Sequence, residues 1–230
     1  MYYFLVYDDG THTEYINKLL ESVKIYGPQF EIIRFQKSDM DPEFVSLNSN
    51  ILTQKRGGGY WLWKPYIIYN ILQKINENDI VFYLDSKYYF IEEFSELYSE
   101  PLKTRDILVW KNQPNTLPEY FMKNWCKMDV IMKYGLYDKV FKYDAEDSWA
   151  GAIIVKKTPS SMIYIKEWLD LCCIYENITD TPSIIWKNSP EFNEHRHDQS
   201  MLSIMLHKNN IPLELFKKRY LQNCRRPYEL

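Results

Sequence analysis

The chain has 230 residues, 46% of them hydrophobic, and its 28 lysine and arginine residues nearly balance 31 aspartate and glutamate residues. This length suits one domain with a substantial core, and the balanced charge argues against a general nucleic-acid binder, which needs a strong basic excess. We see no signal peptide and no apolar stretch long enough for a membrane span, so a separately encoded chain is expected to be soluble and made in a cytoplasm. If the chain is part of a longer protein, its localisation is open.

Strands and helices alternate along the first half of the chain. A helix is predicted where Ile16, Leu19 and Val23 share one face, and Gly27-Pro28 ends it. The polar stretch from residue 36 to 54 shows no clear period. The elements predicted here are strands 2–7, 30–35 and 80–84, the helix between the first two strands, and a helix opened by Pro65.

The second half continues the alternation. The elements predicted here are strands 107–110 and 150–156 and helices 92–98, 119–134, 159–173 and 198–208. Strands that alternate with helices favour an α/β sandwich with a mostly parallel central sheet. No linker or repeat interrupts the pattern, so we expect a single domain over residues 1–230.

The acid that ends strand 80–84 is the first candidate for a binding site. Asp85 directly follows the apolar run and precedes Ser86 and Lys87. Ligands of open α/β sheets bind at the carboxyl ends of strands, and a carboxylate there can hold a divalent cation that in turn holds a diphosphate. One acid does not define a site, but two further segments add to it.

The segment from Arg56 to Pro65 combines a glycine run with tryptophans and a lysine. Three consecutive glycines suit a loop that passes close to a ligand or one that moves, although an ordinary turn is the commoner reason for such a run. The spacing is neither that of a Walker A loop nor that of a Rossmann fingerprint. Lys64, at a helix start, could meet a phosphate; the alternative is a surface lysine whose stem lies along Trp61 or Trp63.

Two polar clusters lie late in the chain. The residues His195 to Gln199 could ligate a metal or bind a pyrophosphate, whereas a helix cap by Asp198 or Ser200 would explain only one of them. Upstream, Glu146 and Asp147 approach a strand whose small residues would let a substrate come close to the backbone. The alternative there is a tight turn with surface acids.

Together these segments resemble the GT-A glycosyltransferases of the nucleotide-diphospho-sugar transferase superfamily, in particular bacterial and large-DNA-virus relatives. The matching motifs are Gly-Tyr-Trp-x-Trp-Lys-Pro at Gly59 to Pro65, Leu-Asp-x-x at the end of strand 80–84, and His-Arg-His-Asp-Gln-Ser at His195 to Ser200. The resemblance implies a GT-A three-layer sandwich, with a nucleotide-sugar half at about 1–110 and an acceptor half at about 111–230. If the protein is viral, its compartment would be the host cytoplasm.

The resemblance also implies which residues form the site. The first strand and its loop should lie beside the base of the nucleotide, and variable segments should contact the acceptor, namely Gln113 to Tyr120 and Ile178 to Phe192. The residues implied to bind the nucleotide sugar are Tyr7, Asp8, Asp9, Thr11, Arg56, Tyr60, Trp63, Lys64, Asp85, Ser86, Lys87, Arg196 and His197. Those implied to border the acceptor are Trp149, Ala150, Gly151 and Gln199.

A divalent cation, Mn²⁺ or Mg²⁺, is part of what the resemblance implies. Asp85 matches the first acid of the family's Asp-x-Asp motif, and His197 is the implied second ligand. The third motif position is Lys87, and a protonated lysine cannot ligate a metal. Either Asp85 holds the ion with phosphates, waters and a late ligand, which we favour because Mg²⁺ often uses one or two carboxylates, or Lys87 neutralises the diphosphate and the enzyme is metal-independent or inactive.

The function implied is hexosyl transfer from a nucleotide diphosphate sugar, with UDP-sugars favoured, to a glycan or protein acceptor. An inverting reaction needs a base, for which Asp198 and Asp147 are the candidates. A retaining reaction does not if the leaving phosphate takes the proton, and the resemblance favours retention.

Two alternatives remain. One is an inactive GT-A-like module that binds a nucleotide sugar, a glycan or a partner. The other is a nucleotidyltransferase, which the acidic loop after the first strand, Asp8 to Thr11, disfavours.

Overall fold

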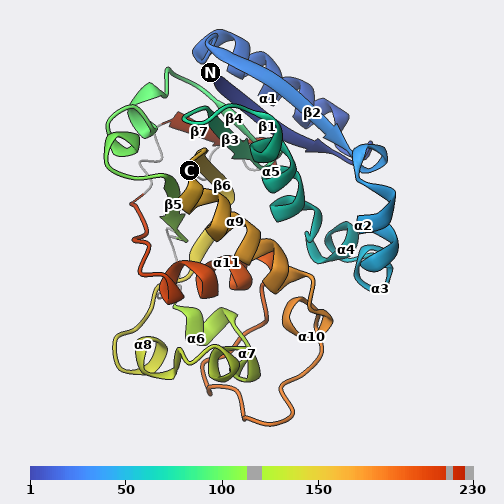
Figure 1. Cartoon of the computed structure of the whole chain (residues 1–230), viewed down its shortest axis with the longest axis vertical. Coiled ribbons are helices and arrows are strands. Elements are labelled where there is room, and N and C mark those ends of the chain that lie inside the picture. Colours follow the sequence, from blue (N-terminus) through green and yellow to red (C-terminus); the bar gives the residue numbers. More distant parts are fainter. Residues whose placement is uncertain (113–120, 216–219, 226–230) are drawn as a thin grey trace.

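A five-stranded sheet runs through the computed structural model of the protein, which describes residues 1–112, 121–215 and 220–225 (Figure 1). The strand order is β2-β1-β3-β6-β5, in which β1 pairs in parallel with β2 and β3, while β6 is antiparallel to β3 and β5. Four strands therefore run one way and one runs the other, which confirms the predicted α/β fold with a mostly parallel sheet. The strands are β1 Tyr2–Asp8, β2 Phe30–Gln36, β3 Ile80–Leu84, β5 Ile107–Lys111 and β6 Ser148–Lys156.

The sheet is covered on both faces because successive strand residues point to opposite sides. Phe4 and Phe82 pack with α1 on one face, while Leu5 and Tyr83 pack on the other with α5, α9 and α11. A small antiparallel sheet of β4 and β7, which the sequence did not predict, joins the α1 side. These covering elements are α1 Thr13–Tyr26, α5 Trp63–Lys74, α9 Pro159–Cys172, α11 His197–Lys208, β4 Tyr88–Phe90 and β7 Leu221–Asn223.

Short helices account for most differences from the predicted elements. The stretch 36–54 contains helices of six and four residues, too short for a helical period to show. The predicted helix 119–134 is split at Cys126-Lys127, and its first two residues lie outside the described part; the predicted helix 92–98 is a single 3-10 turn. The short elements are η1 Lys37–Asp39, α2 Pro42–Leu47, α3 Ser49–Leu52, η2 Ser95–Leu97, η3 Pro101–Lys103, α6 Met122–Trp125, α7 Met128–Lys133, α8 Tyr137–Phe141 and α10 Tyr175–Ile178.

The glycine run forms a left-handed turn, α4 (Gly57–Tyr60). The φ angle is positive at every residue from Gly57 to Trp61, a conformation that only glycine adopts without strain. A Cβ on Gly57 would overlap the ring of Trp61, and one on Gly59 would lie 2.7 Å from Leu52 Cα. The run is thus a tightly packed turn rather than a plain flexible one.

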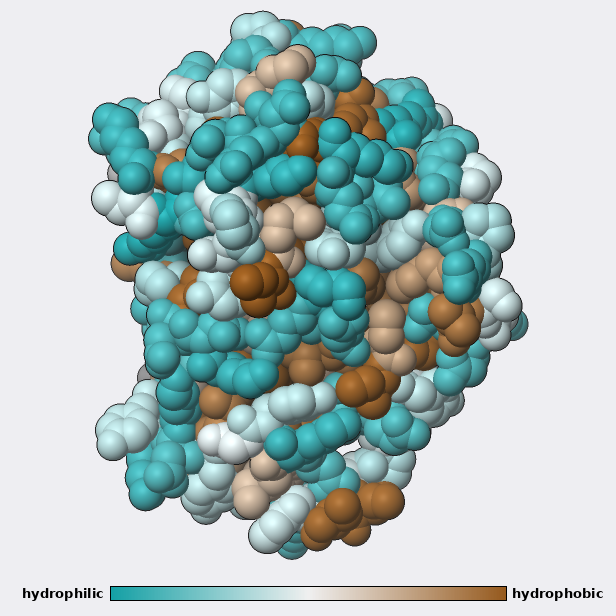
Figure 2. Space-filling model, viewed as in Figure 1, coloured by the Kyte–Doolittle hydropathy of each residue, from teal (hydrophilic) through white to brown (hydrophobic). Residues whose placement is uncertain are grey.

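The surface in the view of Figure 2 mixes hydrophilic and hydrophobic residues, with a hydrophobic group at the lower end where the loop between α10 and α11 lies. That loop carries the exposed side chains of Ile184, Ile185 and Trp186. Asp129 holds it in place, because its carboxylate accepts hydrogen bonds from the three corresponding backbone N–H groups. None of the helices in the described ranges has the length and apolar character that a bilayer crossing requires.

Candidate functional site

A cavity of about 340 Å³ opens at the edge of the sheet where β3 and β5 end and β6 begins. Asp85 follows β3, Asn112 follows β5, and Gly151 lies in β6, whose reversed direction brings its start to the same edge. The first turn of α11 and Lys64 of α5 also line the cavity. This is the edge where open α/β sheets bind ligands, and the volume is in the usual range for small molecules.

Most of the predicted site residues line this cavity. Those that line it are Arg56, Lys64, Asp85, Lys87, Trp149, Ala150, Gly151, Arg196, His197, Asp198 and Gln199. Lining residues that the sequence analysis did not name as site residues are Tyr88, Asn112 and Glu194, while Trp61 was included only as part of the segment Arg56 to Pro65. A simple signal existed for two of these, because Tyr88 directly follows the Asp-x-Lys motif and Asn112 directly follows a strand of the same sheet.

Lys64 is the centre of a buried ion cluster. Its Nζ lies 3.1 Å from Asp198 Oδ2, 3.4 Å from Asp85 Oδ1 and 3.0 Å from the carbonyl oxygen of Ala150. Burial alone would lower the pKa of Lys64, but the carboxylates of Asp198 and Asp85 outweigh it and raise the pKa. The surface position considered from the sequence is therefore wrong: Lys64 is a buried, charged group that joins β3, β6 and α11.

Asp198 is the acidic partner of Lys64 inside α11. Burial raises the pKa of its carboxyl to about 6, Asp85 adds to this, and Lys64 opposes it. Its backbone carbonyl accepts a hydrogen bond from the indole of Trp168 at 2.8 Å, which fixes the first turn of α11. Asp198 lines the cavity, in contact with an ammonium group. Its contact with a substrate stays a prediction.

Asp147 occupies a different place from the one predicted. It is fully buried and does not line the cavity. Its carboxylate accepts hydrogen bonds from Ser203 Oγ at 2.9 Å, from Gln199 Nε2 at 2.6 Å and from Asn112 Nδ2 at 3.3 Å. Burial raises its pKa to about 6. Asp147 therefore lies behind Gln199 and Asn112 and orients their amides, and it does not reach a substrate hydroxyl in this conformation.

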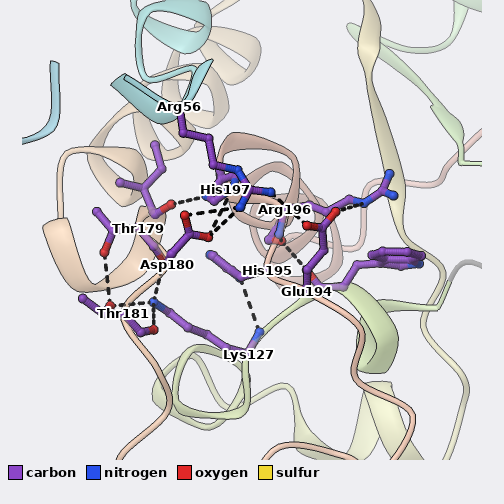
Figure 3. A network of polar contacts seen from close by, with 12 residues as sticks. Arg56, Lys127, Thr179, Asp180, Thr181, Glu194, His195, Arg196 and His197 are labelled. Carbon is purple, nitrogen blue, oxygen red and sulfur yellow. Dashed lines mark hydrogen bonds and ion pairs between the residues drawn. The ribbon is translucent and has the colours of Figure 1, made fainter. Parts of the chain in front are cut away.

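Arg56 is the central residue of an exposed ion-pair group at the rim of the cavity. Figure 3 shows its guanidinium directed at Asp180 and Glu194, at 3.2 and 2.9 Å. Arg196 lies beside it, with its guanidinium stacked 3.8 Å above the ring of Trp125 and its Nε 3.8 Å from Glu194. This group, which we call the rim, links the left-handed turn to the segment that enters α11.

The two histidines of the late cluster hold backbone rather than a ligand. His195 Nε2 meets the carbonyl of Asn177 at 2.6 Å, and His197 Nδ1 meets that of Ile178 at 2.7 Å, so both anchor α10 to the start of α11 (Figure 3). Burial lowers the pKa of both rings. The ring of His197 also packs against Tyr60 and Trp61. Much of this cluster is thus explained by packing.

The predicted acceptor side carries an aromatic pair. The rings of Trp149 and Tyr88 meet edge to face, with centroids 5.3 Å apart. A Cβ on Gly151 would overlap the indole of Trp149. The space that glycine leaves is therefore filled by tryptophan, while Ala150 and Gly151 still line the cavity. The approach of a substrate to the backbone there stays a prediction.

The residues predicted to lie beside the nucleotide base do not line the cavity. The ring of Tyr7 stacks on Trp63 with centroids 3.9 Å apart. Asp8 is paired with Arg34 at 2.6 Å, and Asp9 Oδ1 accepts hydrogen bonds from the backbone and hydroxyl of Thr11. Tyr60 and Ser86 also lie outside the lining, and the segment 113–120 lies outside the described residues. Contact of these residues with a substrate stays a prediction.

The predicted pair of metal ligands does not form a metal site here. Across residues 1–112, 121–215 and 220–225, no three His, Cys, Asp or Glu side chains are grouped to hold an ion. His197 Nε2 is buried without a hydrogen bond, as a ligand nitrogen would be, but its nearest carboxylate is Asp180 at 3.7 Å. Asp85 has ammonium groups near both oxygens. Since ammonium groups repel a dication, the side chains around Asp85 do not fit Mn²⁺ or Mg²⁺.

Comparisons with known proteins give only distant matches. No family model and no curated protein matches the chain significantly. Similar solved structures include a glycosyltransferase involved in glycosylation of the major capsid of PBCV-1, with 12% identity over 74% of this chain and 66% of that one and a TM-score of 0.42. Mouse xyloside xylosyltransferase 1 is 8% identical over 94% and 85% of the chains, with a TM-score of 0.48.

A third similar structure is the bifunctional glycosyltransferase WbbM, 12% identical over 88% of this chain and 37% of that one, with a TM-score of 0.49. This chain therefore spans just over a third of that protein and slightly less than two thirds of the PBCV-1 enzyme. All three proteins are described as glycosyltransferases. With TM-scores below 0.5, these similarities do not assign a function to this chain.

Proposed function

We propose that this protein is a glycosyltransferase that moves a sugar from a nucleotide diphosphate sugar, a UDP-sugar in the first place, to a glycan or protein acceptor. The observation that carries the proposal is the cavity at the carboxyl edge of the sheet. The three segments that resemble GT-A enzymes converge there, each contributing charged side chains. A diphosphate is the ligand that such a cationic site at the end of a parallel sheet would hold.

The charges of the cavity suit a nucleoside diphosphate as leaving group. Its lining has four cationic side chains, those of Arg56, Lys64, Lys87 and Arg196, and two of its three acids contact Lys64. Lys87 and Arg196 would face the phosphates, and Arg56 would join them by exchanging its carboxylate partners for phosphate. Fixed cations directed at the oxygen that gains charge lower the barrier to leaving.

The acceptor would enter along the aromatic side. Trp149 and Tyr88 offer apolar ring surface, which suits the faces of a sugar. Gln199 lines the same cavity and its amide is oriented by Asp147. A glycan or glycoprotein acceptor would therefore lie between the pair Trp149–Tyr88 and Gln199.

Retention of the anomeric configuration is favoured by the state of the two acids. An inverting reaction requires a base that faces the acceptor hydroxyl. Asp147 is buried behind Gln199, and Asp198 is paired with the ammonium of Lys64. With neither acid in the role of a base, the proton of the acceptor would pass to the departing phosphate.

Transfer is tested by incubating the protein with UDP-glucose, UDP-galactose, UDP-N-acetylglucosamine and GDP-mannose, each with a panel of glycans and glycoproteins. Release of the nucleoside diphosphate and the mass increase of the acceptor are measured, and NMR of the product gives its anomeric configuration. We expect one donor to react. The variant Asp198→Asn removes the carboxylate paired with the cation Lys64 and should lower the rate by about 10²-fold or more. The matched control is Asp170→Asn, a surface acid paired with Lys166 on α9.

The outcomes separate the two functions considered. Transfer by the wild type and the control, but not by Asp198→Asn, supports the enzyme. Binding of a nucleotide sugar without transfer to any acceptor would instead favour the inactive module. Failure of every nucleotide sugar to raise the melting temperature, which a ligand of the folded state must do, would overturn the donor site and leave only an inactive module that binds a glycan or a partner.

A further inference from the structure

The carboxylate of Asp85 lies between two lysine side chains. Its Oδ1 is 3.4 Å from Lys64 Nζ and accepts a hydrogen bond from the hydroxyl of Tyr83 at 2.7 Å, while its Oδ2 is 3.8 Å from Lys87 Nζ. Ammonium groups therefore flank the one acid of the Asp-x-Lys motif.

Lys64 stands where a bridging cation would stand. The ammonium of Lys64 donates a hydrogen bond to the carbonyl oxygen of Ala150 and forms ion pairs with Asp198 and Asp85. One positive group thus already joins two of the three carboxylates that line the cavity. A divalent ion bridging the same carboxylates would have to displace an ammonium that is almost fully buried.

Lys87 is more accessible to a ligand than Lys64 is. Its side chain is partly exposed and lines the cavity, its Nζ is beyond hydrogen-bond distance of Asp85, and it lies 5.2 Å from the ring centre of Tyr88. Lys87 can therefore turn toward an anion in the cavity without losing a hydrogen bond to Asp85. Lys87 stands where the family's Asp-x-Asp motif has its second carboxylate, so a positive charge takes the place of a negative one.

From this geometry we infer that the donor site works without a divalent cation: Lys87 binds the diphosphate directly, and Lys64 takes the place of the ion between Asp85 and Asp198. The inference rests on the proposed function and assigns the charge that this function needs. A lysine delivers one positive charge where a metal delivers two, so Arg196 on the opposite segment would add the second.

The transfer step then needs no chemical group beyond the donor, the acceptor and the protein's own side chains. The bond between the anomeric carbon and the bridging oxygen breaks, and its electron pair goes to the departing nucleoside diphosphate. A bond forms between the anomeric carbon and the acceptor oxygen, whose proton passes to an oxygen of the departing phosphate. Lys87 stays protonated throughout and stabilises the charge on the leaving group.

The test is calorimetric titration of the purified protein with UDP, GDP and the same four nucleotide sugars, in EDTA and in excess Mn²⁺ or Mg²⁺. The variants are Lys87→Ala, Lys87→Asp, which restores a second acid, and the surface control Lys166→Ala. Melting temperatures confirm that each variant is folded. We expect equal affinity of the wild type in EDTA and in metal, and about 10-fold or greater weakening by Lys87→Ala, since charge-assisted bonds are worth about 1.5–3 kcal/mol.

Each outcome supports or overturns the metal-free donor site with Lys87 as its phosphate ligand. Lys87→Asp should bind poorly in EDTA and recover with Mn²⁺, while Lys166→Ala should match the wild type. If the wild type binds only with Mn²⁺ or Mg²⁺, the metal-free site is overturned and the proposed function stands. If binding in EDTA is unchanged by Lys87→Ala, Lys87 is not the phosphate ligand. If nothing binds under any condition, the proposed function itself fails.

Discussion

Two groups of charges border the same cavity and differ in burial. In the buried centre formed by Lys64, Asp85 and Asp198, the side chains of Lys64 and Asp198 are each 5% exposed. In the rim, the side chains of Arg56, Asp180 and Glu194 are 43 to 45% exposed. The distances within the two groups are similar, at about 3 Å, so proximity does not distinguish them.

Exposure to water determines whether each group can exchange its partners. A buried charge that loses its partner stays without compensation, whereas an exposed charge regains water. The centre therefore has to keep its partners and works as a fixed part of the site. The rim can exchange a carboxylate for another anion at little cost, which suits the binding and release of a phosphate.

The largest effect is expected from breaking the centre. The variant Lys64→Met leaves Asp198 and Asp85 without their ammonium, and we expect the free energy of unfolding to fall by about 3–5 kcal/mol. Urea denaturation measures it, with Lys166→Met as the control on an exposed pair. A loss below about 1 kcal/mol, the size of a surface pair, would show that the centre is no different from the rim.

Asp147 tests the burial of an acid whose hydrogen-bond partners Asn112, Gln199 and Ser203 are all uncharged. Its pKa of about 6 lies above the reference value of 3.8, so between about pH 4 and 6 the folded state binds more protons than the unfolded state. The free energy of unfolding should therefore fall as pH rises through this window. Each pKa unit corresponds to about 1.4 kcal/mol, so the wild type should lose up to about 3 kcal/mol relative to Asp147→Asn. Urea denaturation of both proteins from pH 4 to 7 measures this, and a pH-independent difference would contradict it.

Substitutions in the left-handed turn that joins Arg56 of the rim to Lys64 of the centre should lower the free energy of unfolding by an intermediate amount. Gly59→Ala meets both a positive φ and the backbone of Leu52, and we expect a loss of about 2–3 kcal/mol. Gly58→Ala has the same sign of φ, but its Cβ would meet only Trp63 Nε1, at an ordinary contact distance of 3.8 Å, so only the strain of about 1 kcal/mol should remain. Thermal or urea denaturation compares the two, and equal losses would show that packing on Leu52 is unimportant.

The smallest effect on stability is expected at the rim. Asp180→Asn should change the free energy of unfolding by less than about 1 kcal/mol, like Asp138→Asn in the surface pair with Lys142. By releasing Arg56 it should raise the affinity for UDP or GDP up to about fivefold at low salt, the equivalent of one exposed pair. Titration at low and high salt measures this, and an affinity that falls would place Asp180 in the binding site itself.

The sequence predicted the elements whose apolar residues repeat over a sufficient length. The strands β1, β2, β3 and β5 and the helices α9 and α11 were predicted within about two residues, because alternating runs and helical faces are visible in one dimension. The helix α1 was predicted from its buried face without a defined start. The small sheet of β4 and β7 was not, because its strands have three residues each and pair across most of the chain. Helices of four to six residues likewise carry no readable period.

The sequence by itself placed Asp85 at the carboxyl edge of an α/β sheet, because this residue directly follows a buried strand. That the segments Arg56 to Pro65 and His195 to Ser200 lie near it was implied only by the resemblance to GT-A enzymes. Only the tertiary structure decided what each side chain does there: Lys64 is buried between two acids, Asp147 lies behind Gln199, and both histidines hold backbone carbonyls. Burial and charge pairing depend on neighbours from other elements, and a linear pattern does not contain those neighbours.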